Sequence, residues 1–304
     1  MICVTTVSTY NTKSFGNISF RYGDVDIDLS SREASEGKTC VEIKLASKKD
    51  LDSILETFYQ MRDLLFLITG KFPKVDALSW NGQGTESRKL SNPFLYKFYT
   101  GNHYSKPYFQ FLEISENSVN PSSLENMKEI NSKSIRSLQS VVSKIYDDIN
   151  STHRLLLLSH AAEGFVAHSK AHENDLKLIA RQRDKPKNKV LYRDRINVLC
   201  APFLEYHDKF DCGIFKLLGT RKKKFLAMIT DTRHSYSHLH ARRPSGLKDE
   251  DGVAFVYHTY LLYIAIRIFL LKDLIGLEPE ENRMRECLYT IRDWIEANES
   301  PTEY

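Results

Sequence analysis

Residues 225–240 read Phe-Leu-Ala-Met-Ile-Thr-Asp-Thr-Arg-His-Ser-Tyr-Ser-His-Leu-His, and they decide how the second half of the chain is interpreted. The stretch is apolar as far as Ile229, with the spacing of a buried helix face. It then becomes rich in histidine, and Arg242 and Arg243 follow closely. Protonatable groups beside fixed positive charge are costly to bury unless they are paired. The stretch therefore predicts a packed helix whose end is exposed and faces an anion.

The region around this stretch has helical periodicity from residue 118 onward. Asn120-Pro121-Ser122-Ser123 marks the change of pattern. The predicted helix at 250–275 is apolar on most sides, as expected of a helix at the centre of a bundle. Residues 118–304 are therefore predicted to form an all-α bundle, with helices at about 123–148, 152–172, 187–201, 222–238, 250–275 and 279–297.

Residues 1–117 are predicted to form a small, β-rich α+β module. Asp50 is the expected N-cap of a helix that runs to about Thr69 and stops at Gly70. Residues 71–117 return to short aromatic-rich runs, including 94–99 and 108–114. The predicted fold class is an α+β module followed by an all-α bundle, predominantly α overall. Short alternating segments predict strands at 17–22, 25–29 and 39–45.

Composition and the absence of common motifs exclude several classes of protein. The five cysteines are scattered without a C-x-x-C pair, which argues against a disulfide framework or a structural zinc site and favours a reducing cytoplasm. The most apolar stretch, 252–266, is shorter than the roughly 20 residues that span a bilayer, so no membrane segment is expected. The chain has no P-loop, no G-x-S-x-G and no G-x-G-x-x-G motif.

Positive charge is concentrated in one part of the sequence. Residues 177–243 hold 17 Lys and Arg against six Asp and Glu, whereas residues 244–304 hold six against 12. A local basic block indicates a polyanion partner, although a solvated, loop-rich surface would look the same. The candidates for phosphate binding in RNA are Arg181, Arg183, Lys222, Lys223, Lys224, Arg242 and Arg243.

Two chemistries are compatible with the histidine-rich segment. His234 and His238 are spaced i, i+4 like metal ligands, but Ser235 stands where a zinc protease needs glutamate, so no metal or other cofactor is expected. The second chemistry is acid–base catalysis on a phosphodiester. Arg233 supplies a fixed charge for phosphate oxygens, and a histidine exchanges protons near neutral pH. RNA carries its own nucleophile, so this chemistry needs no metal.

The spacing of Arg233 and His238 adds a geometric requirement. Side chains five residues apart point about 140° apart on an ideal helix. One helix alone is therefore a poor pocket, whereas two copies related by a two-fold axis could line one cleft. The alternative is a helix C-terminus whose cationic side chains balance the helix dipole.

The segment Arg233-His234-x-x-x-His238 resembles the R-x(4–6)-H signature of HEPN domains. The context from Asp231 to His238 is similar to the Asp-x-Arg-Asn-x-x-x-His context of the ApeA-like HEPN group, which belongs to bacterial anti-phage defence. The segment Ala161-Ala162-Glu163-Gly164-Phe165 also resembles a helix of that group. The resemblance covers roughly residues 120–300.

The resemblance implies a metal-independent endoribonuclease that acts as a homodimer with its site at the subunit interface. Arg233 would hold the scissile phosphate, and His238 would be the general acid and base. His234 stands where the family usually has Asn. Supporting roles are implied for four side chains, those of His234, Asp231, Glu163 and Tyr236.

The expected substrate is single-stranded RNA, tRNA or mRNA, cut after a trigger such as a phage-derived signal. Two alternatives remain open from the sequence. One is a catalytically silent HEPN protein that serves for dimerisation or RNA binding. The other is the toxin of a toxin–antitoxin pair, held inactive by its antitoxin.

Overall fold

The computed structural model describes residues 2–10, 14–33, 38–47, 51–70, 74–81, 87–89, 109–130, 133–135, 137–138, 151–169, 172–181, 189–237 and 252–297. The chain divides into two compact units. The first comprises Met1–Tyr104 and Tyr108–Lys128, and the second comprises Ser105–Pro107 and Glu129–Tyr304. Each unit is described separately below.

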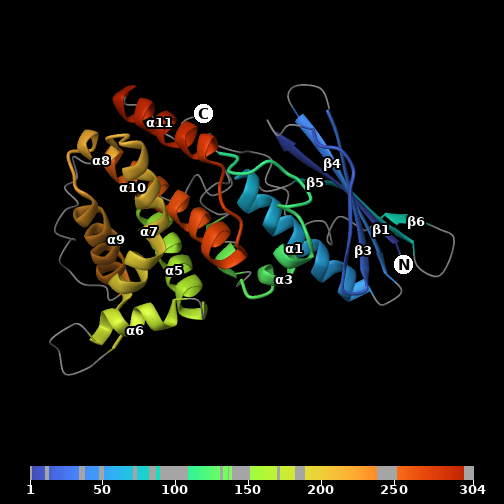
Figure 1. Cartoon of the computed structure of the whole chain (residues 1–304), viewed down its shortest axis with the longest axis horizontal. Coiled ribbons are helices and arrows are strands. Elements are labelled where there is room, and N and C mark those ends of the chain that lie inside the picture. The colour runs from blue at the N-terminus through green and yellow to red at the C-terminus, as the bar shows by residue number, and fades with distance from the viewer. Residues whose placement is uncertain are drawn as a thin grey trace. The chain divides into compact units, whose positions relative to one another are not determined.

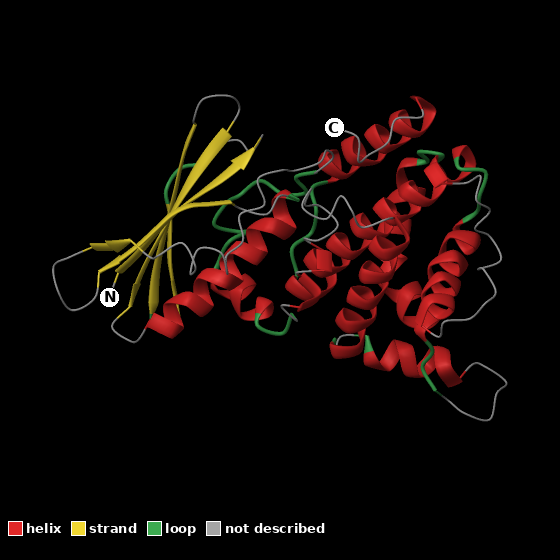
Figure 2. Ribbon diagram, turned by 180° about the vertical axis from the view of Figure 1, so that it is seen from behind, coloured by secondary structure: helices red, strands yellow, loops and turns green. Residues whose placement is uncertain are grey.

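The first unit is built on an antiparallel sheet that twists strongly (Figure 2). Its strand order is β2-β3-β4-β1-β5-β6. β1 lies between β4 and β5 and pairs with both, with a register shift between Thr6 and Val7 on the β5 side. The strands are β1 (Ile2–Tyr10), β2 (Ile18–Tyr22), β3 (Val25–Glu33), β4 (Lys38–Ser47), β5 (Lys74–Asn81) and β6 (Ser87–Lys89).

Alternation along the strands explains which face of the sheet is covered. In β4, Val41, Ile43 and Leu45 are buried, while the intervening Glu42 and Lys44 are exposed. Successive side chains of a strand point to opposite faces, so one face carries the core. The apolar residues of β3, at positions 25, 27 and 29, are buried in the same alternation.

Helix α1 (Leu51–Thr69) covers this core and packs against β3 and β4 (Figure 1). Its apolar residues recur at helical spacing, and Gly70 follows with a positive φ of 75°. The short helix α3 (Pro121–Met127) packs against α1 and β2. Asn120 caps α3, because its side chain accepts a hydrogen bond from the Ser123 N–H at 2.9 Å.

The second unit is helical (Figure 1). Its central helix is α10, which is buried on nearly every side from Tyr257 to Phe269 and contacts both α5 and α7. The segment α10 continues directly into a π-helix, η4, and Gly276 ends it in the left-handed region. The elements are α5 (Ser151–His168), α6 (Glu173–Arg181), α7 (Tyr192–Phe210), α8 (Ile214–Leu217), α9 (Lys222–Ser237), α10 (Gly252–Phe269), η4 (Leu270–Ile275) and α11 (Glu281–Ala297).

The predicted fold class is confirmed: a sheet-containing first part is followed by a helical region, and helix predominates. Several predicted helix bounds are wrong. The helix expected at 123–148 is interrupted, because α3 ends at Met127, a turn follows, and helical residues resume at 133–135 and 137–138, while 139–148 lie outside the described residues. The helix expected at 187–201 begins at Tyr192 and continues through Pro202 to Phe210. The helix expected at 152–172 ends at His168, and α6 and α8 are separate helices that the periodicity did not predict.

Two further expectations about the fold are affected by the structure. The aromatic run at 108–114 contains no strand in its described part, 109–114. Phe111 and Ile114 are instead buried as an irregular segment, and the Phe111 N–H donates to the Ile68 carbonyl at the end of α1. The run at 94–99 lies outside the described residues. Every helix in the described ranges is too short or too polar to cross a bilayer.

Candidate functional site

Three helices of the second unit meet around the predicted catalytic arginine. Helix α9 packs against α5 and α7, and α5 packs against α7. The inner face of α9 is formed by Phe225, Ile229 and Thr232, which are fully buried and recur at helical spacing. Arg233 follows directly after Thr232, so its side chain leaves the helix at the edge of this buried face.

The guanidinium of Arg233 is held from two directions. Its Nη2 donates to Glu163 Oε2 on α5 at 2.6 Å. Its Cζ lies 4.8 Å from the centre of the Tyr192 ring on α7, which is cation–π distance. A planar group held at one edge and on one face keeps a defined orientation. The packing of three helices therefore fixes where Arg233 points.

Arg195 is the second cation at this site. Its Nη1 donates to Glu163 Oε1 at 2.9 Å, so one carboxylate binds two guanidinium groups, one through each oxygen. The side chains of Arg195, Glu163 and Arg233 are 26%, 24% and 22% exposed. All three side chains of the cluster are therefore partly accessible to solvent.

The start of α7 positions Tyr192 and Arg195. The Leu191 N–H donates to the side chain of Asp194 at 2.6 Å, which satisfies a backbone group at the helix N-terminus. The Tyr192 hydroxyl donates to the Ser159 carbonyl of α5 at 3.2 Å. Burial raises the pKa of the Tyr192 hydroxyl, which keeps it in the neutral, donating form. The ring beneath Arg233 is thereby fixed to α5 as well as to α7.

Of the other residues predicted for the site, some lie on α9 outside the cluster and others lie outside the described residues. Asp231 and His234 lie on α9 with exposed side chains, and the cluster formed by Arg233, Glu163 and Arg195 includes neither of them. The backbone of Tyr236 belongs to the last turn of α9. His238, the predicted acid–base partner, lies outside the described residues, and so do Arg183, Arg242 and Arg243.

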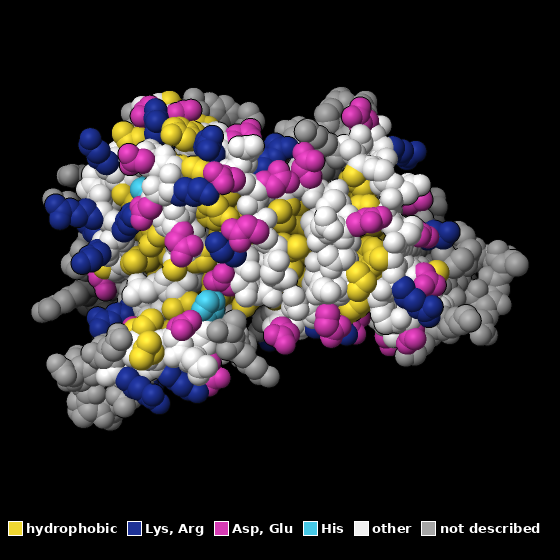
Figure 3. Space-filling view, in the orientation of Figure 1, with side chains coloured by type: hydrophobic (Ala, Val, Ile, Leu, Met, Phe, Trp, Pro, Cys, Tyr) yellow, Lys and Arg dark blue, Asp and Glu magenta, His cyan; other side chains and the backbone are white. Residues whose placement is uncertain are grey.

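The described basic candidates lie on α6 and α9. Lys223 and Lys224 are exposed at the start of α9, and Arg181 is exposed at the end of α6. Lys222 is bound to the carboxylate of Asp208 on α7. Figure 3 shows Lys and Arg side chains over the helical unit with Asp and Glu between them. On the face that Figure 3 shows, the described basic side chains are therefore mixed with acidic ones.

His172, four residues after His168 in the sequence, lies just before α6 and has a structural explanation. His172 lies between two carboxylates, with Nε2 3.1 Å from Asp273 of the π-helix and Nδ1 3.4 Å from Asp175. Its ring also packs on Phe269. Among the described residues, no group of three or more His, Cys, Asp or Glu is arranged to hold a metal ion.

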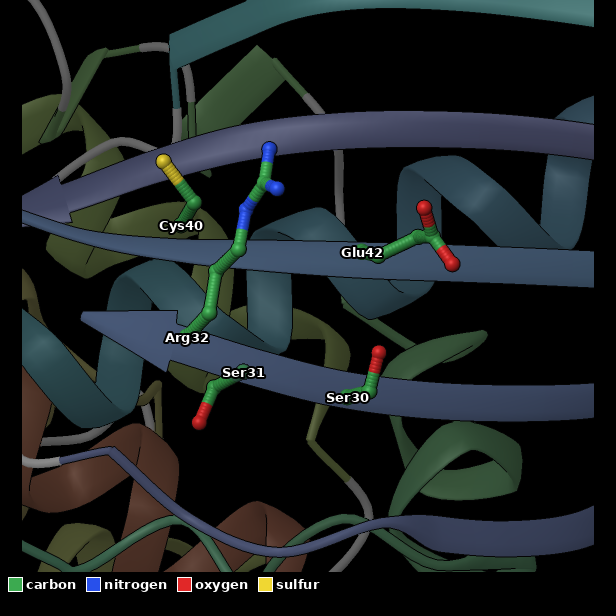
Figure 4. Close-up of a pocket in the computed structure, with 5 residues that line it drawn as sticks. All are labelled: Ser30, Ser31, Arg32, Cys40 and Glu42. Carbon is green, nitrogen blue, oxygen red and sulfur yellow. The ribbon is translucent and has the colours of Figure 1, made fainter. Parts of the chain in front are cut away.

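A hollow of about 220 Å³ lies in the first unit, on β3 and β4 (Figure 4). It is lined by Ser30, Ser31, Arg32, Cys40 and Glu42, which come from two paired strands. The Ser31 hydroxyl is hydrogen-bonded to the backbone of Phe15, because it donates to the Phe15 carbonyl and accepts from the Phe15 N–H. None of the predicted catalytic or phosphate-binding residues lines this hollow.

Sequence reasoning did not predict that Tyr192 and Arg195 belong with Arg233. The available signal was their i, i+3 spacing near the start of a helix, which places both side chains on one face. That spacing does not say which other helix the face meets. The contacts join residues 32 and 70 positions apart in the chain.

The family comparison covers this whole cluster. A family model described as Apea-like HEPN matches residues 113–281, which is more than half of the chain. The match confirms the resemblance predicted from the Arg233 segment. No curated protein and no protein of solved structure was found to match the chain.

Proposed function

Because the chain belongs to the Apea-like HEPN family, we propose that it is a metal-independent endoribonuclease whose reaction depends on Arg233 and His238. The observation that supports this most directly is the orientation of Arg233. Its guanidinium is held by Glu163 and Tyr192 and still remains 22% exposed. A fixed, reachable guanidinium is suited to stabilise charge on a phosphate in the transition state.

The proposed reaction needs only groups that RNA and the protein supply. The 2′-oxygen attacks the adjacent phosphorus, and the bond from phosphorus to the 5′-oxygen breaks. His238 takes the proton from the 2′-hydroxyl or returns one to the leaving 5′-oxygen. Arg233 neutralises the charge that develops on the non-bridging oxygens. The products are a 2′,3′-cyclic phosphate and a 5′-hydroxyl end.

The basic residues have a separate role in this proposal. Arg181, Arg183, Lys222, Lys223, Lys224, Arg242 and Arg243 bind backbone phosphates of single-stranded RNA, tRNA or mRNA without reading the sequence. His234, Asp231 and Tyr236 support the site from the end of α9. The second unit forms the homodimer, and the first acts as a sensing or regulatory module in anti-phage defence.

The test is cleavage of RNA by purified protein in the presence of EDTA. We expect wild-type protein to cleave under chelation and to leave 2′,3′-cyclic phosphate ends. Arg233→Ala and His238→Ala should each reduce the rate at least about 100-fold, because positioned donors and acid–base groups contribute that much or more. Arg285→Ala, in an acidic part of the same unit, is the control and should keep the wild-type rate.

Three outcomes contradict the proposal. If the wild-type protein bound RNA without cleaving it, the chain would be a catalytically silent RNA-binding module. If EDTA abolished cleavage, the reaction would depend on a metal ion. Cleavage that persists at the wild-type rate in both Arg233→Ala and His238→Ala would place the site elsewhere.

A further inference from the structure

Glu163 holds two arginines, although one would suffice to orient Arg233. Arg233 binds one of its carboxylate oxygens and Arg195 binds the other. The two guanidinium groups therefore lie side by side, separated by the width of one carboxylate. They come from different helices, α9 and α7, which both pack on α5.

The charges of this cluster do not cancel. Counting the ion pairs between described residues, one carboxylate and two guanidinium groups leave a net charge of +1 at a place where each side chain is about three-quarters buried. Unbalanced charge is costly in such surroundings unless a further anion is close. The Nε atoms of both arginines are buried and make no hydrogen bond in the described part of the chain.

We infer that Arg195 is a second phosphate-binding side chain of the site, and that Glu163 is the positioning residue that sets its spacing from Arg233. This inference rests on the proposed ribonuclease function. Glu163 lies between the two guanidinium groups, so they do not close on a single phosphate. Arg233 binds the scissile phosphate, and Arg195 binds the phosphate next to it along the strand.

The competing explanation is that Arg195 only neutralises Glu163. The two explanations differ in how salt affects RNA binding. A side chain that contacts phosphate releases counterions, and each such contact adds about 0.7 to the salt slope for single strands, where the salt slope is the magnitude of the fall of log K with log salt. An arginine that only pairs with Glu163 leaves that slope unchanged when it is removed.

The experiment measures binding of a single-stranded RNA oligonucleotide to the full chain carrying His238→Ala, which keeps the RNA intact. In this background, Arg195→Gln should weaken binding about fivefold to thirtyfold near physiological salt and lower the salt slope by about 0.7. The matched control is Arg285→Gln, because Arg285 also pairs with a carboxylate, Glu281, in the same unit. It should leave both quantities unchanged.

A second pair of variants guards against a change in folding. Glu163→Gln and the double variant Glu163→Gln with Arg195→Gln both lack the carboxylate, so neither leaves an unpaired charge on Glu163. If Arg195 binds phosphate, the salt slope of the double variant is lower by about 0.7 than that of Glu163→Gln. Equal slopes in this pair overturn the inference.

The failure of the inference is distinguishable from the failure of the proposed function. If the wild-type chain cleaves RNA but Arg195→Gln leaves the salt slope unchanged, the function stands and the role of Arg195 is structural. If the wild-type chain neither binds nor cleaves RNA, the proposed function itself fails, and the role of Arg195 falls with it.

Discussion

Arg233 shows how a single side chain can be oriented before any substrate arrives. Free arginine has about 2 kcal/mol of rotamer entropy, and part of this is lost when its guanidinium is fixed. The folded chain bears that cost in advance, through Glu163 at one edge and Tyr192 on one face. A donor that is already oriented needs little reorganisation when charge develops on the phosphate. Its orientation therefore matters as much as its charge.

His207 gives a prediction about stability and pH. It is buried on α7 against Phe215, and its Nε2 makes no hydrogen bond to the described residues. Burial lowers its pKa, and Lys222 adds to that effect, while Asp208 and Asp211 oppose it. The unfolded chain, with a pKa of about 6.5, then binds the proton more readily. We therefore expect stability to be complete above about pH 6.5 and to fall as the pH drops through the lower folded pKa.

The measurement is thermal unfolding between pH 8 and pH 5, followed by circular dichroism. His207→Gln cannot titrate at this position, so its transition temperature should change less over that range than the wild-type value, even if it is lower throughout. Each unit by which the pKa is lowered corresponds to about 1.4 kcal/mol of stability. The control is His160→Gln at an exposed position of α5. A pH dependence that His207→Gln leaves intact would show that another group causes it.

The sequence predicted which residue types carry the chemistry better than it predicted which side chains contact one another. Arg233 was predicted as the catalytic cation and Glu163 as one of four supporting side chains, and the structure pairs these two residues. Arg195 was visible only as one member of a basic segment. Tyr192 had no signal that separated it from any packed tyrosine. The difference is physical, because residue type and spacing set local chemistry, whereas the choice of contacts across helices depends on how the helices pack.

Helix α7 continues well beyond its predicted end, and the cause lies in packing. Proline inside a helix removes a hydrogen bond and costs roughly 3 kcal/mol, which made Pro202 the expected end. The helix instead continues because Phe203 and Tyr206 beyond it are buried with Leu199 before it. Burial of large apolar side chains, at about 1.5–3 kcal/mol each, outweighs the local cost. The strand at 2–10 was not predicted, and it forms by pairing with β4 and β5 on its two sides.

Gly276 provides a test at the level of one element. It ends η4 with φ 80° and ψ 24°, and its N–H donates to the Leu271 carbonyl. A Cβ at this position meets nothing within 4 Å, so any penalty comes from the backbone alone. We expect Gly276→Ala to lower the free energy of unfolding by about 1 kcal/mol, measured by urea denaturation.

The control at the same position is Gly276→Asn. Asparagine adopts the left-handed region more readily than alanine, so the loss should be smaller. If alanine proved as stable as glycine, the end of η4 would have to adopt another conformation in solution. If asparagine and alanine were equally destabilising, the cost would not come from the sign of φ.

At the scale of the molecule, charge is distributed unevenly along the chain. Residues 1–128 contain 15 Lys and Arg and 15 Asp and Glu, whereas residues 129–304 contain 28 and 24. Within the second part, residues 129–243 hold 22 Lys and Arg against 12 Asp and Glu, whereas residues 244–304 hold six against 12. This distribution was readable from the sequence because charge counts need no coordinates. The sequence could not show whether a second copy completes the site, because an interface depends on shape as well as on composition.

A second copy of the chain leads to the last prediction. Arg233 and His238 are five residues apart, a spacing that turns them about 140° apart on a continuous helix. A cleft that uses both is more readily completed by the same helix of a partner related by a two-fold axis. Cleavage per chain should therefore fall when the protein is diluted below the dissociation constant of the dimer.

The measurement pairs RNA cleavage rates with sedimentation velocity over the same protein concentrations, with inert carrier protein added to the cleavage assays to prevent adsorption. We expect the rate per chain to follow the fraction of dimer, since only paired chains form the cleft. Addition of excess His238→Ala chains at constant wild-type concentration should then convert wild-type homodimers into mixed dimers and change the rate. A constant rate per chain at concentrations where sedimentation finds only monomers would place a complete site within one chain.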